Sequence, residues 1–108
     1  METIFLVTVF QKIAKSNYDK NLPDFGDRRC VGWFNNKNEA IFSLENNIGN
    51  IHTDERNVYE YAIIEEVEPG IMQVDINSIL YKWNNNIYGY KEIDKDPLVK
   101  THCNFGIG

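Results

Sequence analysis

The residues best suited to act together chemically are aromatic and lie near the carboxyl end of the chain. Four of them are evenly spaced on either side of an asparagine-rich stretch: Tyr81, Trp83, Tyr88 and Tyr90. Asparagine tolerates the positive φ that tight hairpins need, so we expect 85–86 to form a two-residue turn. In that register Trp83 faces Tyr88. Tyr81 likewise faces Tyr90, so the four rings share one face of a hairpin.

The aromatic hairpin predicts a binding site for a nucleotide-like ligand, because stacked rings can hold a nucleobase through their π surfaces. Arg28 and Arg29 would neutralise a phosphate of the same ligand, and Tyr59 and Tyr61 would add two further rings. The predicted ligand-binding residues are therefore the two arginines and the four hairpin aromatics. The alternative is that the rings cover the helix as ordinary core, which is the commoner place for large aromatic side chains.

Histidine and cysteine residues lack the spacing of a metal site. The chain holds two of each: His52, His102, Cys30 and Cys103. A zinc site of two thiolates and two imidazoles usually contains a pair such as Cys-x-x-Cys, and none occurs here. We therefore expect no metal and no cofactor. Cys30 lies among apolar residues of a predicted strand, so a role as a small hydrophobic residue is favoured over a catalytic thiol.

The acidic run at 65–68 is a second candidate for chemistry, since two carboxylates can act as acid and base or hold a divalent cation. Strand alternation sends Glu65 and Glu66 to opposite faces, so at least one of them is expected to be solvated. The seven glycines are scattered and form no phosphate-binding loop. No catalytic residues are predicted, and binding functions rank above an enzyme.

Composition bounds the class of protein. A chain of 108 residues has the size of a single domain, which we expect to span 1–108. The formal net charge of -5 has the wrong sign for general DNA or RNA binding, and it suits docking on a basic surface. No apolar run approaches the ~20 residues needed to cross a bilayer, and the first residues lack signal-peptide features. A cytoplasmic protein without membrane contact is expected.

Two strands are predicted in the first third of the chain. Residues 3–10 form a continuous β-branched and aromatic run, which is typical of a central strand covered on both faces. A long polar loop is expected over 14–27. Residues 29–34 then form a short strand that we expect to pair antiparallel with the first.

One helix is predicted over 37–48. Asn35 or Asn36 can cap its start, because an asparagine side chain accepts hydrogen bonds from free N–H groups of the first turn. Its apolar residues repeat at helical spacing: Ile41, Leu44 and Ile48. Gly49 suits a left-handed residue at its end.

The second half of the chain is predicted to be mainly strand. Residues 58–67 have strong β character, and 71–74 start a returning segment. A hairpin joins 79–83 to 87–93, and 104–108 can add a short edge strand. The expected fold is α+β, a mostly antiparallel sheet in β-β-α-β-β-β order with one main helix packed on one face.

Several stretches together resemble a group of small proteins encoded by Firmicutes and by their phages. These stretches are RCVGWF at 29–34, the helix ending in NNIGNI, YEYAIIEEVEPGI at 59–71, the YKWN hairpin and the terminal NFGIG. Small acidic proteins from such phages are frequently counter-defence factors, which sequester a nucleotide signal or block a host protein. The resemblance implies a context and supplies no catalytic residues.

Three function hypotheses follow. The first is a non-enzymatic protein that sequesters a small nucleotide-like signal, which predicts a cavity bordered by tyrosine and arginine. The second is an anti-CRISPR-like inhibitor that binds a host defence protein through an acidic or aromatic surface, which predicts an exposed patch. The third is a small enzyme with a cleft that holds a histidine or a carboxylate pair. Self-association through a sheet edge, at 4–10 or at 104–108, is a further expectation.

Overall fold

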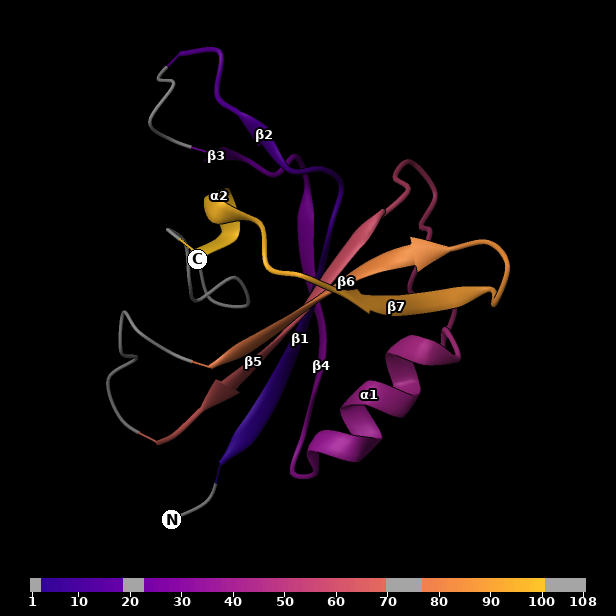
Figure 1. The fold of residues 1–108 in the computed structure, drawn as a ribbon. Helices are drawn as coiled ribbons and strands as arrows, with labels where there is room; N and C mark the ends of the chain where they lie inside the picture. Colours follow the sequence, from indigo (N-terminus) through magenta and orange to yellow (C-terminus); the bar gives the residue numbers. More distant parts are fainter. Residues whose placement is uncertain (1–2, 19–22, 70–76, 101–108) are drawn as a thin grey trace.

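Five antiparallel strands form the central sheet, in the order β4-β1-β5-β6-β7 (Figure 1). The structure, a computed structural model, describes residues 3–18, 23–69 and 77–100. The sheet consists of β1 (Ile4–Phe10), β4 (Arg28–Phe34), β5 (Tyr61–Val67), β6 (Ser78–Asn84) and β7 (Gly89–Ile93). The main helix, α1 (Lys37–Glu45), follows β4, and a short helix, α2 (Pro97–Lys100), follows β7. The predicted α+β fold and the order of its main elements are confirmed.

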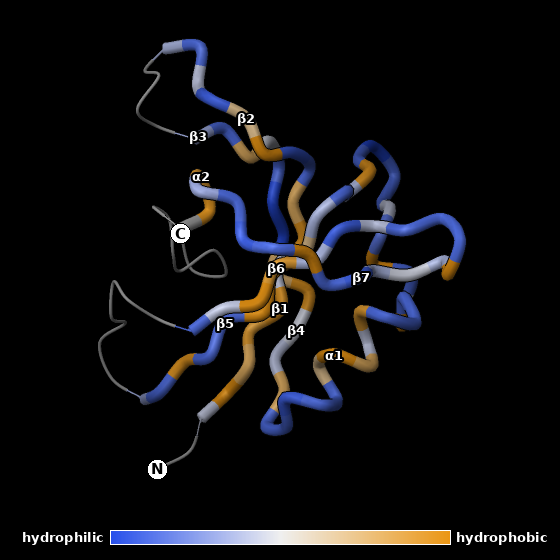
Figure 2. Tube along the Cα trace, in the orientation of Figure 1, coloured by the Kyte–Doolittle hydropathy of each residue, from blue (hydrophilic) through white to orange (hydrophobic). Residues whose placement is uncertain are grey.

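Each face of the sheet carries its own group of buried apolar side chains. The first group lies beneath α1: Val7, Val9, Ala40, Leu44, Tyr59, Ala62, Ile64, Tyr81, Trp83 and Tyr90. The second group lies on the opposite face with α2: Phe10, Phe25, Ile63, Leu80 and Val99. The two helices lie on opposite sides of the sheet (Figure 1), and apolar residues are concentrated along β1, β5 and β6 (Figure 2). The apolar run at 3–10 is therefore covered on both faces, as predicted.

β1 is an interior strand, paired with β4 on one side and with β5 on the other. The predicted antiparallel pairing with 29–34 is confirmed. The expectation that 4–10 offers an unpaired sheet edge is wrong, because both sides of this strand carry ladders. The edges of the described sheet are β4 and β7. The segments 71–74 and 104–108, predicted as further strands, lie outside the described residues.

α1 starts as predicted, with Asn36 as its cap. The side-chain oxygen of Asn36 accepts hydrogen bonds from the backbone N–H groups of Asn38 at 2.8 Å and Glu39 at 3.3 Å. Glu39 also places a negative charge in the first turn, where it complements the helix dipole. The local sequence thus fixes where the helix begins.

α1 ends at Glu45, earlier than the predicted end at Ile48. Asn47 and Gly49 adopt positive φ values of 47° and 77°, which a right-handed helix cannot contain. Ile48 therefore leaves the buried face of the helix and is 52% exposed. Neither described helix has the length and apolar character needed to cross a bilayer.

The β6–β7 hairpin departs from the predicted register. Residues 85–88 connect the strands, so Trp83 pairs with Tyr90 and not with Tyr88. A Cβ atom on Gly89 would overlap the carbonyl oxygen of Glu45, so only glycine lets the end of α1 rest on β7. Tyr88 adopts a positive φ of 50° and belongs to the turn, so β7 begins at Gly89 and the connection is longer than the two residues predicted.

The polar stretch 14–27, predicted as an irregular loop, contains a small ladder between β2 (Ala14–Lys15) and β3 (Pro23–Asp24). Phe25 follows β3 and is buried against Phe10, with ring centroids 5.3 Å apart. This contact anchors the stretch to the sheet face that α2 covers.

Candidate functional site

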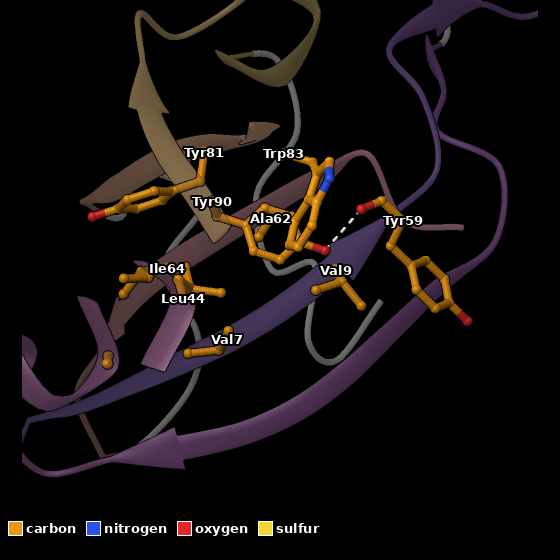
Figure 3. Close-up of a cluster of buried hydrophobic side chains, with 10 residues drawn as sticks. Val7, Val9, Leu44, Tyr59, Ala62, Ile64, Tyr81, Trp83 and Tyr90 are labelled. Atoms are coloured by element: carbon orange, nitrogen blue, oxygen red, sulfur yellow. Dashed lines mark hydrogen bonds between the residues drawn. The ribbon is translucent and has the colours of Figure 1, made fainter. Parts of the chain in front are cut away.

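Three of the four hairpin aromatics lie in the core beneath α1 (Figure 3). Tyr81 is 2% exposed, Trp83 is 8% exposed and Tyr90 is fully buried. Their rings and the side chain of Leu44 from α1 belong to one buried cluster between the sheet and the helix. The structure therefore agrees with the alternative interpretation, in which these rings are core residues under the helix.

Two polar groups of the aromatic cluster, the Tyr90 hydroxyl and the Trp83 indole N–H, form hydrogen bonds within the chain. The Tyr90 hydroxyl donates to the carbonyl oxygen of Tyr59 at 2.7 Å, and Figure 3 shows this bond as a dashed line. The Trp83 indole N–H donates to Asn85 Oδ1 at 2.7 Å. The His52 ring stacks on Trp83 with centroids 3.5 Å apart. One face of the indole and its N–H group are thus already in contact with the protein.

Burial also sets the protonation of the two core tyrosines. Burial, with a smaller effect of Glu92, raises the pKa of Tyr81 to about 12. Burial, with a smaller effect of Glu60, raises the pKa of Tyr90 above its ordinary value. Both hydroxyls are therefore neutral donors at physiological pH and cannot serve as bases.

Tyr88 is the exposed member of the predicted set. It lies in the turn with a positive φ of 50°, and its side chain is 67% exposed. Its ring meets Trp83 edge to face at 5.2 Å. Ile87 beside it is 51% exposed, so the hairpin tip presents two apolar side chains.

Arg28 and Arg29 are exposed on β4 and point to opposite faces of the sheet, because their partners on β1 are the neighbouring residues Phe10 and Val9. The hydrogen bond from the Tyr59 hydroxyl is the main cause of the lowered pKa of Asp54, and Arg29, which lies near that carboxyl group, helps to lower it through its charge. The structure thus brings Trp83, Tyr88 and Tyr90 together. It leaves Arg28 on the other side of the sheet, and the ligand-binding role of the set stays a prediction.

The residues considered for catalysis are dispersed. Glu65 is fully buried, whereas Glu66 is half-buried on the other face of β5, so the predicted alternation is confirmed. The expectation that one of the two is solvated therefore applies to Glu66 alone. Cys30 is exposed on β4. Among the described residues no group of three His, Cys, Asp or Glu side chains could hold a metal ion, and His102 and Cys103 lie outside them.

An apolar groove lies between α1 and the end of β4. Its volume is about 510 Å³, and its lining residues are Phe34, Asn36, Asn38, Glu39, Phe42, Ser43 and Ile48. Phe42 is 59% exposed and Ile48 is 52% exposed, although both are large and apolar. Large apolar side chains gathered on a surface are typical of a place where another molecule binds.

The groove adjoins an edge of the sheet. Phe34, which lines the groove, is the last residue of β4, and among the described strands β4 pairs only with β1. Trp33, the preceding residue, is 61% exposed on the opposite face of the strand, since it pairs with Leu6 whereas Phe34 pairs with Phe5. The outer backbone groups of β4 and the apolar groove therefore form one continuous surface, which we call the β4–α1 surface.

Sequence interpretation missed the groove. The helical spacing predicts Ile48 on the buried face of the helix and makes no prediction for Phe42. One signal was present: Phe42 lies two positions before Leu44, and residues with this spacing do not share a helix face. A phenylalanine off the buried stripe of a short helix indicates an exposed apolar side chain.

Comparison of the chain with protein-family models, with curated proteins and with solved structures found no match.

Proposed function

We propose that this protein acts by binding another protein, with the β4–α1 surface as the contact. The observation that carries the proposal is the exposure of Phe42 and Ile48 around a groove that contains Phe34. Exposed side chains of this size leave apolar area in water, which a partner would remove. Only one lining residue, Glu39, carries a charge, so the groove suits an apolar anchor side chain.

The partner segment is proposed to bind as an added strand. An extended peptide that pairs with β4 would satisfy the backbone groups on its outer side, and one of its side chains would enter the groove near Phe34. Arg28 and Arg29 lie at the opposite end of β4 and are exposed. Acidic residues of the partner segment would complement them.

This proposal corresponds to the inhibitor hypothesis, in which the protein blocks a host defence protein. It is favoured over a nucleotide held by the hairpin rings, because Tyr81, Trp83 and Tyr90 are buried beneath α1 and the His52 ring already covers one face of the indole. The counter-defence context rests on the sequence resemblance alone.

The test is selection of binding peptides from a displayed random library with the purified protein, followed by affinity measurement on two variants. Phe42→Ser should raise the Kd of selected peptides at least tenfold, because loss of an apolar anchor costs roughly 2 kcal/mol. Ile87→Ser is the matched control, since Ile87 is 51% exposed and lies outside the groove. Peptides that bind Phe42→Ser as tightly as the natural protein would overturn the proposal.

A further inference from the structure

A second pocket lies on the same face of the sheet as α1 and shares no lining residue with the groove. Its volume is about 350 Å³, which is near the lower end of the range for small-molecule sites. β1, β5, β6, the first residue of α1 and the segment after β7 all contribute to it. A pocket built by so many separate segments is a candidate ligand site in its own right.

The floor of this pocket is apolar. Phe5, Ile64 and Ile79 line it, and all three belong to or pack against the core beneath α1. Ile64 and Ile79 are directly opposed on β5 and β6, so they present adjoining side chains on one face. Such a floor suits a flat apolar group more than a hydrated ion.

Two lysines line the same pocket. Lys37 is the first residue of α1 and is exposed, whereas Lys95 follows β7 and is half-buried. Neither makes an ion pair with a described residue. Two cations that line one pocket from separate segments favour a ligand with a negative group, and phosphate accepts hydrogen bonds from several lysine N–H groups at once.

The other polar residues of the pocket disfavour a bare anion. Glu66 accepts a hydrogen bond from Asn77 Nδ2 at 3.2 Å, and both line the pocket beside Ser78. The Glu66 carboxylate would repel a simple phosphate ion, but it would accept hydrogen bonds from an N–H group. The ligand must therefore carry a negative group at one end and N–H donors at the other.

From this combination we infer that the pocket binds a small phosphorylated ligand of the mononucleotide class. The lysines face the phosphate, the apolar floor carries the flat base, and Glu66 with Asn77 accepts from N–H groups of the base. The size of the pocket favours a single nucleotide over an oligonucleotide. The inference is independent of the proposed protein partner, because the two sites use different residues.

The test is a titration of the ¹⁵N-labelled full chain with AMP, GMP, CMP and UMP, with adenosine and inorganic phosphate as fragments. At least one mononucleotide should shift the backbone amide signals of Ser78 and Ile79 and leave the Trp83 indole N–H signal in place. Phosphate and adenosine alone should bind at least about tenfold more weakly, because each lacks half of the contacts.

Variants complete the test. Lys37→Ala and Lys95→Ala should each weaken mononucleotide binding about tenfold, since each removes a charged hydrogen-bond donor. Lys91→Ala is the matched control, because Lys91 is exposed on β7 and does not line the pocket. Glu66→Gln should change the preference among the four bases, since an amide presents a donor where the carboxylate only accepts.

Four outcomes would overturn the inference. They are the absence of binding by all four mononucleotides at millimolar concentration, equal binding by phosphate alone, unchanged affinity in both lysine variants, and a shift confined to the Trp83 indole. The last would place the ligand at the aromatic hairpin.

Discussion

His52 lies flat against Trp83, with ring centroids 3.5 Å apart and ring planes inclined by 7°. The His52 Nδ1 atom is 3.1 Å from the carbonyl oxygen of Tyr59, which also accepts the Tyr90 hydroxyl at 2.7 Å. His52 therefore ties the segment between α1 and β5 to the β6–β7 hairpin. A histidine of the chain itself occupies the indole surface that was expected to hold a nucleobase.

Replacing His52 should loosen this connection. His52→Ala is expected to lower the free energy of unfolding by about 1–2 kcal/mol, because the stacked contact is lost. His52→Phe should recover part of this loss, since a phenyl ring keeps the stack but has no nitrogen to contact the Tyr59 carbonyl oxygen. Urea unfolding followed by far-UV circular dichroism measures both. An alanine variant as stable as the natural protein would show that the stack contributes nothing.

The hydroxyl of Tyr90 makes a buried hydrogen bond, and its removal has a predictable cost. Tyr90→Phe should lower the free energy of unfolding by about 1 kcal/mol, because the bond to Tyr59 is lost inside the core. Tyr81→Phe is the matched control, since Tyr81 is also buried and its hydroxyl makes no hydrogen bond to a described residue. Equal effects of the two substitutions in urea unfolding would contradict the assignment.

Parts of this fold could be predicted because their signals are local. The β-branched run of β1 and the helix cap depend on residues that adjoin in sequence; the strand was predicted correctly, and Asn36 is one of the two predicted caps. Tyr88 adopts a positive φ of 50° and so belongs to the hairpin turn, and Gly89 after it lies against Glu45, a contact between elements distant in sequence. Asparagine preferences alone therefore gave a turn that is too short.

The candidate sites were harder to predict for the same reason. The groove arises because α1 stops before Ile48, which leaves that side chain in solvent, and because Phe42 lies on a different face of the helix from the buried Leu44. The second pocket joins Lys37 to Lys95 through the fold, and no motif relates the two in sequence. The spacing of the hairpin aromatics predicted a binding face, yet the same spacing is what a strand needs to cover a helix.

Asp54 should make stability depend on acid pH. Hydrogen bonds from the Tyr59 hydroxyl and from the backbone N–H groups of Arg56 and Asn57 lower its pKa below the ordinary 3.8. Because the folded-state pKa is the lower one, this contribution is present above pH 3.8 and is lost as the pH falls through the folded-state value. The Asp54→Asn variant should be less stable than the natural protein at pH 7, and the difference should shrink as the pH falls below 3.8.

Chemical denaturation at several pH values between 7 and 2 measures this difference. Asp27→Asn serves as a control, because Asp27 is also an exposed acidic residue, whereas the Tyr59 hydroxyl donates its hydrogen bond to Asp54. A stability difference for Asp54→Asn that stays constant down to pH 2 would mean that the carboxylate does not interact in the folded state.

Thr8 offers the opposite kind of change, a substitution that should stabilise the protein. Its side chain is fully buried on β1, and its hydroxyl oxygen has no hydrogen-bond partner in the described part of the structure. Burying such a hydroxyl costs about 1–3 kcal/mol. Thr8→Val keeps the shape and removes the hydroxyl, so it should raise the free energy of unfolding by about 1 kcal/mol.

A higher urea midpoint with an unchanged slope would confirm this effect. Thr53→Val is the matched control at a half-buried position and should change stability little. A destabilised Thr8→Val protein would mean that the hydroxyl forms a hydrogen bond in the folded state.

Thr8 alternates with Val7 and Val9, which lie beneath α1, so its side chain points to the face away from both candidate binding sites. The stabilised variant is therefore a suitable background in which to test Phe42→Ser and Lys95→Ala, because losses of binding there could not be attributed to unfolding.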